Sequence, residues 1–166
     1  MTCLLLSLVV ALPIGERLTY RVKYGPLSAG TLTLALVGIE ELRGESCYHL
    51  ISHLRSNPAY ATLFSLNDSI ESWTRISDFV TLRTRKHVRE GSYECELVAD
   101  FDPVAGQVSY SDSEQMTTAH DARDLLSLWY YFRTLDLSVG DDFWVTCHVD
   151  KKTYDALVSV AGRETV

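Results

Sequence analysis

The sequence predicts an α+β domain that is mostly β: a curved antiparallel β-meander, shaped as a half-barrel, around one main α-helix. The only long helical periodicity lies in residues 121–135, where four apolar residues recur at i, i+3, i+4 and i+7: Leu125, Leu128, Trp129 and Phe132. Elsewhere, apolar and polar residues alternate, as they do along strands with one buried face. One long helix among many short strands favours a sheet that closes over the helix.

The predicted helix begins at Asp121, whose carboxylate can cap the free N–H groups of the first turn. Asp124 adds negative charge near this end, and Arg133 adds positive charge in the last turn, as the helix dipole favours. Further apolar residues widen the helix surface beyond one stripe: Leu126, Tyr130 and Tyr131. We therefore expect the helix to be buried on more than one side.

Before the helix, alternation predicts a series of short strands, expected over residues 17–24, 32–36, 46–55 and 70–75. Turn residues separate them: Gly25-Pro26 with Gly30 closing the turn, Arg43-Gly44, Asn57-Pro58 and Asn67-Asp68. A short helical turn is expected over residues 59–66.

Residues 79–100 predict a hairpin folded at Glu90-Gly91, with Val88 opposite Tyr93. On the other face, this register places His87 opposite Glu94 and Arg85 opposite Glu96, and it leaves Arg83 opposite Val98. A basic stripe of four residues lies on that face: Arg83, Arg85, His87 and Arg89. Because cross-strand carboxylates neutralise two of them, a solvated face is the simpler interpretation, and Arg83 is the residue left for an external anion.

Beyond this hairpin, we expect a short strand over 107–111, a polar mobile loop over 111–118 and, after the helix, a final hairpin over 140–160. The turn of the final hairpin is expected near Asp150-Lys151, and residues 163–166 resemble the start of another strand. No repeat or linker divides the chain, which predicts one domain over residues 15–166.

The net charge of −7 and the pI near 5.1 argue against a nucleic-acid partner. Leu4 to Ile14 is an apolar run too short for a membrane-spanning helix, which needs about 20 residues. Its length is typical of the apolar region of a secretory signal peptide, although a buried N-terminal strand is an alternative. We therefore predict a signal peptide over residues 1–14 and an exported protein that is not transmembrane.

The residues that carry chemistry do not form a recognisable catalytic motif. His49 and His53 lie about 13 Å apart along a strand, too far to share a zinc ion. His148 and Asp150 share a strand face, but no nucleophile accompanies them. Three cysteines lie in predicted strands without CxxC spacing, so small buried side chains are the simplest interpretation and one disulfide stays open: Cys47, Cys95 and Cys147. We predict no catalytic residue, metal site or cofactor.

The aromatic residues of the helix and sheet support two interpretations. They can simply fill the core, or they can leave an apolar cavity between helix and sheet. For the second case, the candidate ligand-binding residues are Trp73, Arg83, Trp129 and Phe132.

A likeness to a known family is carried by six segments: GERLTYRVKYGPLSAGTLTL, SNPAYATLFSLNDSIESW, RKHVREG, FDPVAGQVSY, LLSLWYYFRTLDLSVGDDFWV and KKTYDALVSVAGRETV. In these, the chain resembles the bacterial domain-of-unknown-function family 3108 from about Gly15 to its end. The resemblance implies an exported envelope protein that continues beyond Val166. Members tend to have Asp-Gly where this chain has Asp150-Lys151, and a left-handed lysine costs about 1 kcal/mol, so we expect that turn to be rearranged.

The resemblance implies no activity, but by architecture the family is similar to lipoprotein-carrier half-barrels. The leading hypothesis is a non-catalytic binding domain for an apolar or amphipathic ligand such as a lipid, in the periplasm or otherwise exported. One alternative is a structural or partner-binding module that contacts another envelope protein. The other is a hydrolase that uses His148, Asp150 or Arg83.

Overall fold

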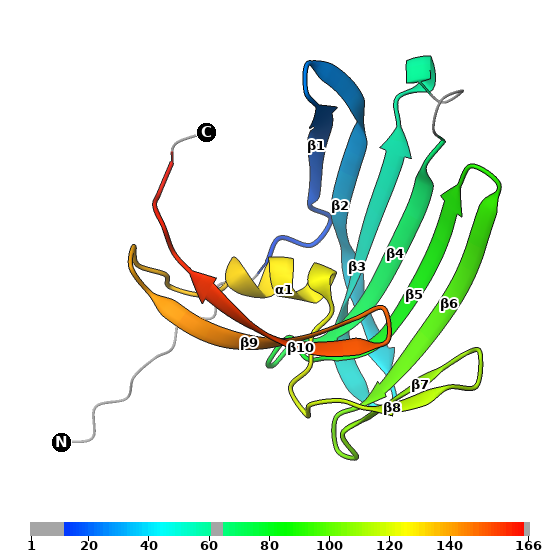
Figure 1. Cartoon of the computed structure of the whole chain (residues 1–166). Coiled ribbons are helices and arrows are strands. Elements are labelled where there is room, and N and C mark those ends of the chain that lie inside the picture. Colours follow the sequence, from blue (N-terminus) through cyan, green and yellow to red (C-terminus); the bar gives the residue numbers. More distant parts are fainter. Residues whose placement is uncertain (1–11, 61–64, 165–166) are drawn as a thin grey trace.

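The computed structural model describes residues 12–60 and 65–164, which form one curved eight-stranded antiparallel sheet, one α-helix and a separate two-stranded hairpin (Figure 1). The strands of the large sheet pair in sequence order, and the sheet is not closed into a barrel. The predicted fold class is therefore confirmed. The elements are β1 (Arg17–Tyr24), β2 (Leu27–Leu42), β3 (Glu45–Ser56), a 3₁₀ turn (Pro58–Tyr60), β4 (Asn67–Arg75), β5 (Thr81–Glu90), β6 (Tyr93–Asp102), β7 (Gln107–Tyr110), β8 (Gln115–Thr117), α1 (Leu125–Phe132), β9 (Asp142–Val149) and β10 (Lys152–Ser159).

The first turn is tighter than its glycines and proline predicted. Tyr24 pairs with Leu27, so only Gly25 and Pro26 form the turn, with Gly25 at φ 57°. Gly30 does not close the turn but lies within β2, where a Cβ atom would be 2.4 Å from the carbonyl oxygen of Arg55. Glycine is required there by the close approach of β3.

Two other predicted turns and loops are strands. Asn67 and Asp68 begin β4, and the polar segment over 111–118 contains β8. In both places, pairing with a neighbouring strand overrides the weak local preference for a turn. The helical turn predicted over 59–66 is described only at its ends, because residues 61–64 lie outside the described residues.

The β5–β6 hairpin turns at Gly91 and Ser92, one position later than predicted. Glu90 pairs with Tyr93, and Gly91 has φ 60°, as the first central residue of a type II′ turn requires. Every cross-strand partner therefore shifts, although each side chain keeps its predicted face. Arg83, predicted opposite Val98, instead lies opposite Asp100.

The helix begins at Leu125 and is capped by Asp124, not by Asp121. The segment before it is extended and joined to β9, since the Arg123 N–H donates to the Thr146 carbonyl at 3.1 Å. The predicted apolar stripe is wrong as a buried face, because Leu125 is 63% exposed and Trp129 is 45% exposed. The buried residues of α1 are Leu126, Ser127, Leu128 and Tyr130. No helix among residues 12–60 and 65–164 is long and apolar enough to cross a membrane.

The helix is enclosed between the concave face of the sheet and the β9–β10 hairpin, which crosses it on the other side (Figure 1). Leu126 and Tyr130 pack against a cluster from β2 and β3, which includes Leu34, Leu36, Tyr48 and Leu50. Leu128 packs on the opposite side, against Val145 and Cys147 of β9. The helix is therefore buried on two sides, as its wide apolar surface predicted.

The N-terminal part of the described chain joins this core. Leu12 is 5% exposed within the β2–β3–α1 cluster, and Gly15 N–H donates to the Leu36 carbonyl at 2.9 Å. Leu12 falls within the range predicted as a signal peptide, of which residues 1–11 lie outside the described residues.

The last hairpin turns where the sequence predicted, and without rearrangement. Asp150 and Lys151 have φ of 46° and 63°, the left-handed pair of a type I′ turn, and Val149 pairs with Lys152. The expectation that lysine would displace this turn is wrong, because ion pairs made by both turn residues offset its conformational cost. Beyond β10, Arg163 and Glu164 are irregular, and residues 165–166 of the predicted further strand lie outside the described residues.

Candidate ligand-binding groove

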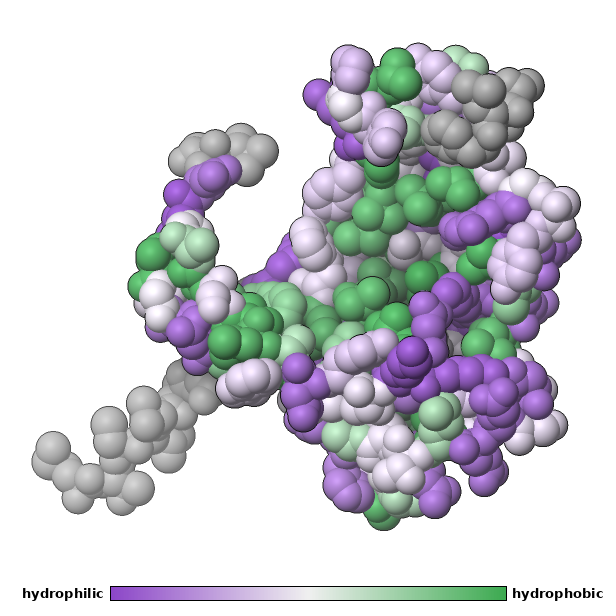
Figure 2. All heavy atoms as spheres, in the orientation of Figure 1, coloured by the Kyte–Doolittle hydropathy of each residue, from purple (hydrophilic) through white to green (hydrophobic). Residues whose placement is uncertain are grey.

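The upper part of the concave face forms an open groove of about 660 Å³. Figure 2 shows it as a hollow, with apolar residues along it, above the helix and hairpin. This volume is within the range of about 300–1,000 Å³ that is typical of small-molecule sites. Its apolar lining consists of Leu32, Leu54, Ile70, Val88, Tyr93, Cys95 and Leu97.

The groove follows from strand alternation combined with incomplete cover. Side chains two apart on β2 to β6 point to the same concave face, so one apolar strip continues from the core into the groove. The helix contacts β3, β4 and β9. Beneath the helix, Leu50 of β3 is fully buried. Leu54, four residues further along the same strand, lies past the helix and lines the groove. The same strand thus supplies both a core residue and a groove residue.

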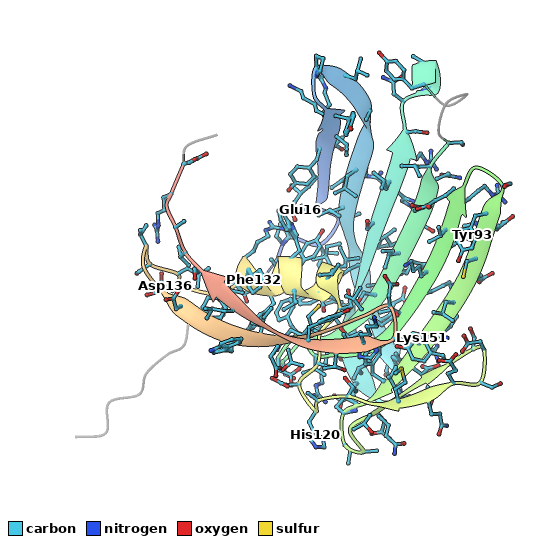
Figure 3. All side chains as sticks on the ribbon, viewed as in Figure 1. Glu16, Tyr93, His120, Phe132, Asp136 and Lys151 are labelled. Atoms are coloured by element: carbon cyan, nitrogen blue, oxygen red, sulfur yellow. The ribbon has the colours of Figure 1, made fainter. Side chains whose placement is uncertain are left out.

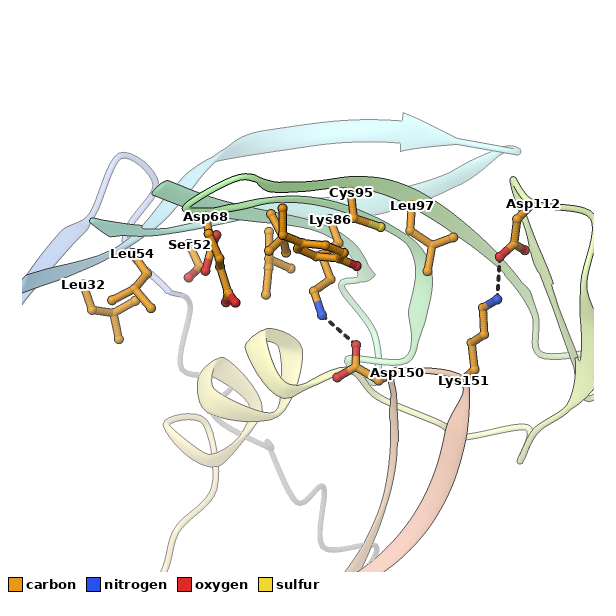
Figure 4. Close-up of a pocket in the computed structure, with 14 residues that line it drawn as sticks. Leu32, Ser52, Leu54, Asp68, Lys86, Cys95, Leu97, Asp112, Asp150 and Lys151 are labelled. Carbon is orange, nitrogen blue, oxygen red and sulfur yellow. Dashed lines mark hydrogen bonds and ion pairs between the residues drawn. The ribbon is translucent and has the colours of Figure 1, made fainter. Parts of the chain in front are cut away.

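The tip of the β9–β10 hairpin closes the lower end of the groove through ion pairs. Lys86 Nζ of β5 lies 2.7 Å from Asp150 Oδ1 (Figure 4). Lys151 Nζ contacts Asp112, and it lies 2.9 Å from Glu114 Oε1. Figure 3 places Lys151 at this tip and Tyr93 near the β5–β6 turn, so the groove extends between these two places.

A smaller inner cavity of about 170 Å³ adjoins the groove between the sheet, α1 and β9. The two share four lining residues: Ile70, Lys86, Leu97 and Asp150. The inner cavity is comparable to an engineered apolar cavity of about 150 Å³ that binds benzene. The Lys86–Asp150 ion pair lies where the two spaces meet.

A neutral pair, Tyr110 and His148, forms one wall of the inner cavity. Burial raises the pKa of Tyr110 to about 12 and lowers the pKa of His148, so the phenol and the imidazole are both uncharged at neutral pH. The Tyr110 hydroxyl then donates to His148 Nε2, and His148 Nδ1 donates to Thr153 Oγ1 at 2.8 Å. The protons of Tyr110 and His148 are thus donated within the chain, and this wall presents no charge to the cavity.

The buried carboxylate of Asp124 also lines the inner cavity, and its oxygens are occupied by hydrogen bonds within the chain. It accepts the N–H groups of Leu126 at 2.7 Å and Ser127 at 3.1 Å. It further accepts the hydroxyls of Ser72 at 2.5 Å and Thr81 at 2.7 Å. Asp124 therefore joins the helix start to β4 and β5, and it has no role left for a ligand.

The four predicted ligand-binding residues lie in three different places, and none lines the groove or the inner cavity. Trp73 lies on the outer face of the sheet, where its indole N–H donates to Glu40 Oε2 at 2.7 Å and its ring stacks on His49 at 4.6 Å. Arg83 shares that face and donates to Asp100 Oδ1 at 2.8 Å, so it does have an acidic partner. Both side chains are engaged within the chain.

The two helix residues of this set also contact other side chains. Trp129 is packed edge-on against Tyr20 of β1, with ring centroids 5.9 Å apart. Phe132 packs against Phe143 of β9 at 6.0 Å, in the helix–hairpin core.

The groups weighed for hydrolysis are held apart. His148 is bonded to Tyr110 and Thr153, whereas Asp150 is bonded to Lys86. Arg83 lies on the opposite face of the sheet from both cavities. Of the three described cysteines, all are free: Cys47 and Cys147 are buried and Cys95 lines the groove.

Sequence reasoning missed the groove residues, although their signal was present. Leu54, Val88 and Leu97 each belong to a correctly predicted alternation, but alternation also describes core positions. The feature that separates groove from core is the position of α1 along the strands, which no local pattern reports.

The fold and groove thus define a class of protein: an open antiparallel half-barrel that holds a helix and an apolar groove on its concave face. The model of the DUF3108 family, described as a protein of unknown function, matches residues 19–166, and the chain belongs to this family. Comparisons with curated proteins and with solved structures gave no match.

Proposed function

We propose that this protein is a binding domain for an amphipathic ligand with an apolar chain, held in the groove between the concave face and the β9–β10 hairpin. The observation that carries the proposal is a groove of about 660 Å³ in which seven apolar side chains from neighbouring strands form a strip, with charged residues at its two ends. Exposed apolar surface of this extent is costly in water and is typical of binding sites.

The lining of the inner cavity favours an apolar chain as the part of the ligand that enters it. Among the described residues, its lining includes no buried side-chain N or O atom without a hydrogen-bond partner. An apolar group entering it would therefore leave no polar atom newly unpaired.

We further propose that the protein acts in the bacterial envelope. The apolar run from Leu4 to Ile14 and the resemblance of the chain to exported proteins support this location. Fractionation of cells that express the full-length gene tests it, since recovery in the cytoplasmic fraction would contradict export.

A matched pair of tryptophan variants tests the groove. Cys95 and Glu96 are neighbours on β6, but Cys95 lines the groove and Glu96 is exposed on the outer face. Cys95→Trp should fill the groove and weaken binding of the neutral dye N-phenylnaphthylamine by about tenfold or more, the equivalent of about 1.4 kcal/mol. Glu96→Trp should leave the affinity unchanged.

Fluorescence titration gives both dissociation constants, and circular dichroism verifies that each variant is folded. Absence of saturable binding by the unmodified protein would contradict the proposed function. Equal affinities of the two variants would place the dye outside the groove and contradict it as well.

A further inference from the structure

The charged side chains along the groove are not balanced. At the lower end, Lys86 lies 2.7 Å from Asp150, and Lys151 contacts both Asp112 and Glu114. Both lysines that line the groove are therefore neutralised by carboxylates of the same chain (Figure 4). Among the described residues that line the groove, no lysine or arginine is left free for an anionic ligand.

The upper end of the groove carries two carboxylates, Asp68 and Glu90. Asp68 and Glu90 line the groove, and neither forms an ion pair within residues 12–60 and 65–164. Asp68 accepts the backbone N–H of Arg89 at 2.9 Å, while the Arg89 guanidinium lies 2.6 Å from Glu94. Tyr93 is the cross-strand partner of Glu90, and its side chain lines the same groove as both carboxylates.

The next step rests on the proposed function and concerns the charge of the ligand's polar end. We propose that the ligand is a single-chain amphiphile with a cationic ammonium head. Its head lies at Asp68, Glu90 and the ring of Tyr93, and its chain follows the apolar strip toward the hairpin. Carboxylates attract an ammonium group, and the face of an aromatic ring adds to that attraction. An anionic head would meet unpaired carboxylates with both lysines already occupied.

Three amphiphiles with the same chain and different heads test the proposal: dodecyltrimethylammonium, dodecyl maltoside and dodecanoate, each below its micelle concentration. Isothermal titration calorimetry on the full chain at about 0.01 M salt should give about tenfold tighter binding of the cation than of the neutral probe, and weaker binding of the anion than of either. The advantage of the cation should decline as salt screens the carboxylates.

A charge-matched pair of variants localises the effect. Asp68→Asn with Glu90→Gln should remove most of the preference for the cation and leave the affinity for dodecyl maltoside unchanged. Glu41→Gln with Glu96→Gln changes the net charge equally, at exposed residues that do not line the groove, and should retain the preference.

The possible outcomes distinguish failure of the cationic head from failure of the proposed groove function. Equal binding of all three probes, or a preference that survives Asp68→Asn with Glu90→Gln, would overturn the cationic head and leave the groove function standing. Failure of all three probes to bind would overturn both.

Discussion

The two halves of the concave face differ in what covers them, although the same strands build both. In the lower half, α1 and the hairpin cover the sheet, and residues such as Leu36 and Leu50 are fully buried. In the upper half, residues from the same alternation line an open groove. The difference shows that strand alternation decides which side chains face inward, whereas a third element decides whether they become core or binding surface.

The largest expected effect comes from truncating matched leucines in the two halves. Leu50→Ala should destabilise the fold by about 2–5 kcal/mol, because it removes a fully buried side chain and leaves a cavity. Leu54→Ala, on the same strand, should cost about 1 kcal/mol or less, because its side chain already faces the groove.

Urea denaturation monitored by circular dichroism measures both free energies of unfolding. Equal losses for the two variants would mean that the upper half is packed as tightly as the lower half, and the comparison would fail.

A second prediction concerns the residue that fastens the cover to the sheet. Asp124→Ala removes the helix cap and the buried carboxylate that accepts the hydroxyls of Ser72 and Thr81, so it should destabilise the fold by about 2–4 kcal/mol. Asp124→Asn keeps a capping oxygen and should cost less. Asp121→Ala, at the cap position that the sequence suggested, should change stability by about 0.5 kcal/mol or less.

These three variants can be compared by thermal and urea unfolding under identical conditions. A loss at Asp121 as large as that at Asp124 would contradict the assignment of the cap.

The smallest effect is a dependence of stability on pH in the covered half. Burial lowers the pKa of His148 in the folded protein below its unfolded value of about 6.5. Below about pH 6.5 the unfolded state therefore binds more protons than the folded state. The free energy of unfolding falls as the pH decreases through this range. His148→Gln should reduce this fall between about pH 8 and pH 5, and the remainder includes His53, whose pKa burial also lowers.

Unfolding free energies measured across this pH range test the prediction, with the exposed His120→Gln variant as control. An unchanged pH profile in His148→Gln would exclude His148 as a contributor.

Much of the fold could be predicted from the sequence, because its strongest signal has a short period. Alternation predicted the strands that carry Leu54, Val88 and Leu97, and a slip of one position in the β5–β6 turn kept each side chain of that hairpin on its predicted face. The same slip misplaced the partner of Arg83, since cross-strand pairing depends on the turn type at Gly91.

The candidate site could not be predicted in the same way. The helix is apolar on nearly every side, so its periodicity could not decide whether Trp129 or Tyr130 faces the core. The position of α1 along β3 and β4 depends on long-range contacts, notably the hydrogen bonds of Asp124 with Ser72 and Thr81. The candidates were chosen for their aromatic or basic character. One of them, Trp73, lies on the outer face of the sheet, whereas other residues line the groove on the concave face.

The sequential order of the strands has a consequence for how the chain folds. Each of the eight strands pairs only with strands adjacent to it in sequence, so the sheet can grow hairpin by hairpin with little entropy lost in closing long loops. The helix and the β9–β10 hairpin follow the sheet in the chain, and during synthesis they emerge after it. For that interval the apolar core residues of the concave face are uncovered, which makes this stage of folding the one at which the nascent chain is most prone to aggregate.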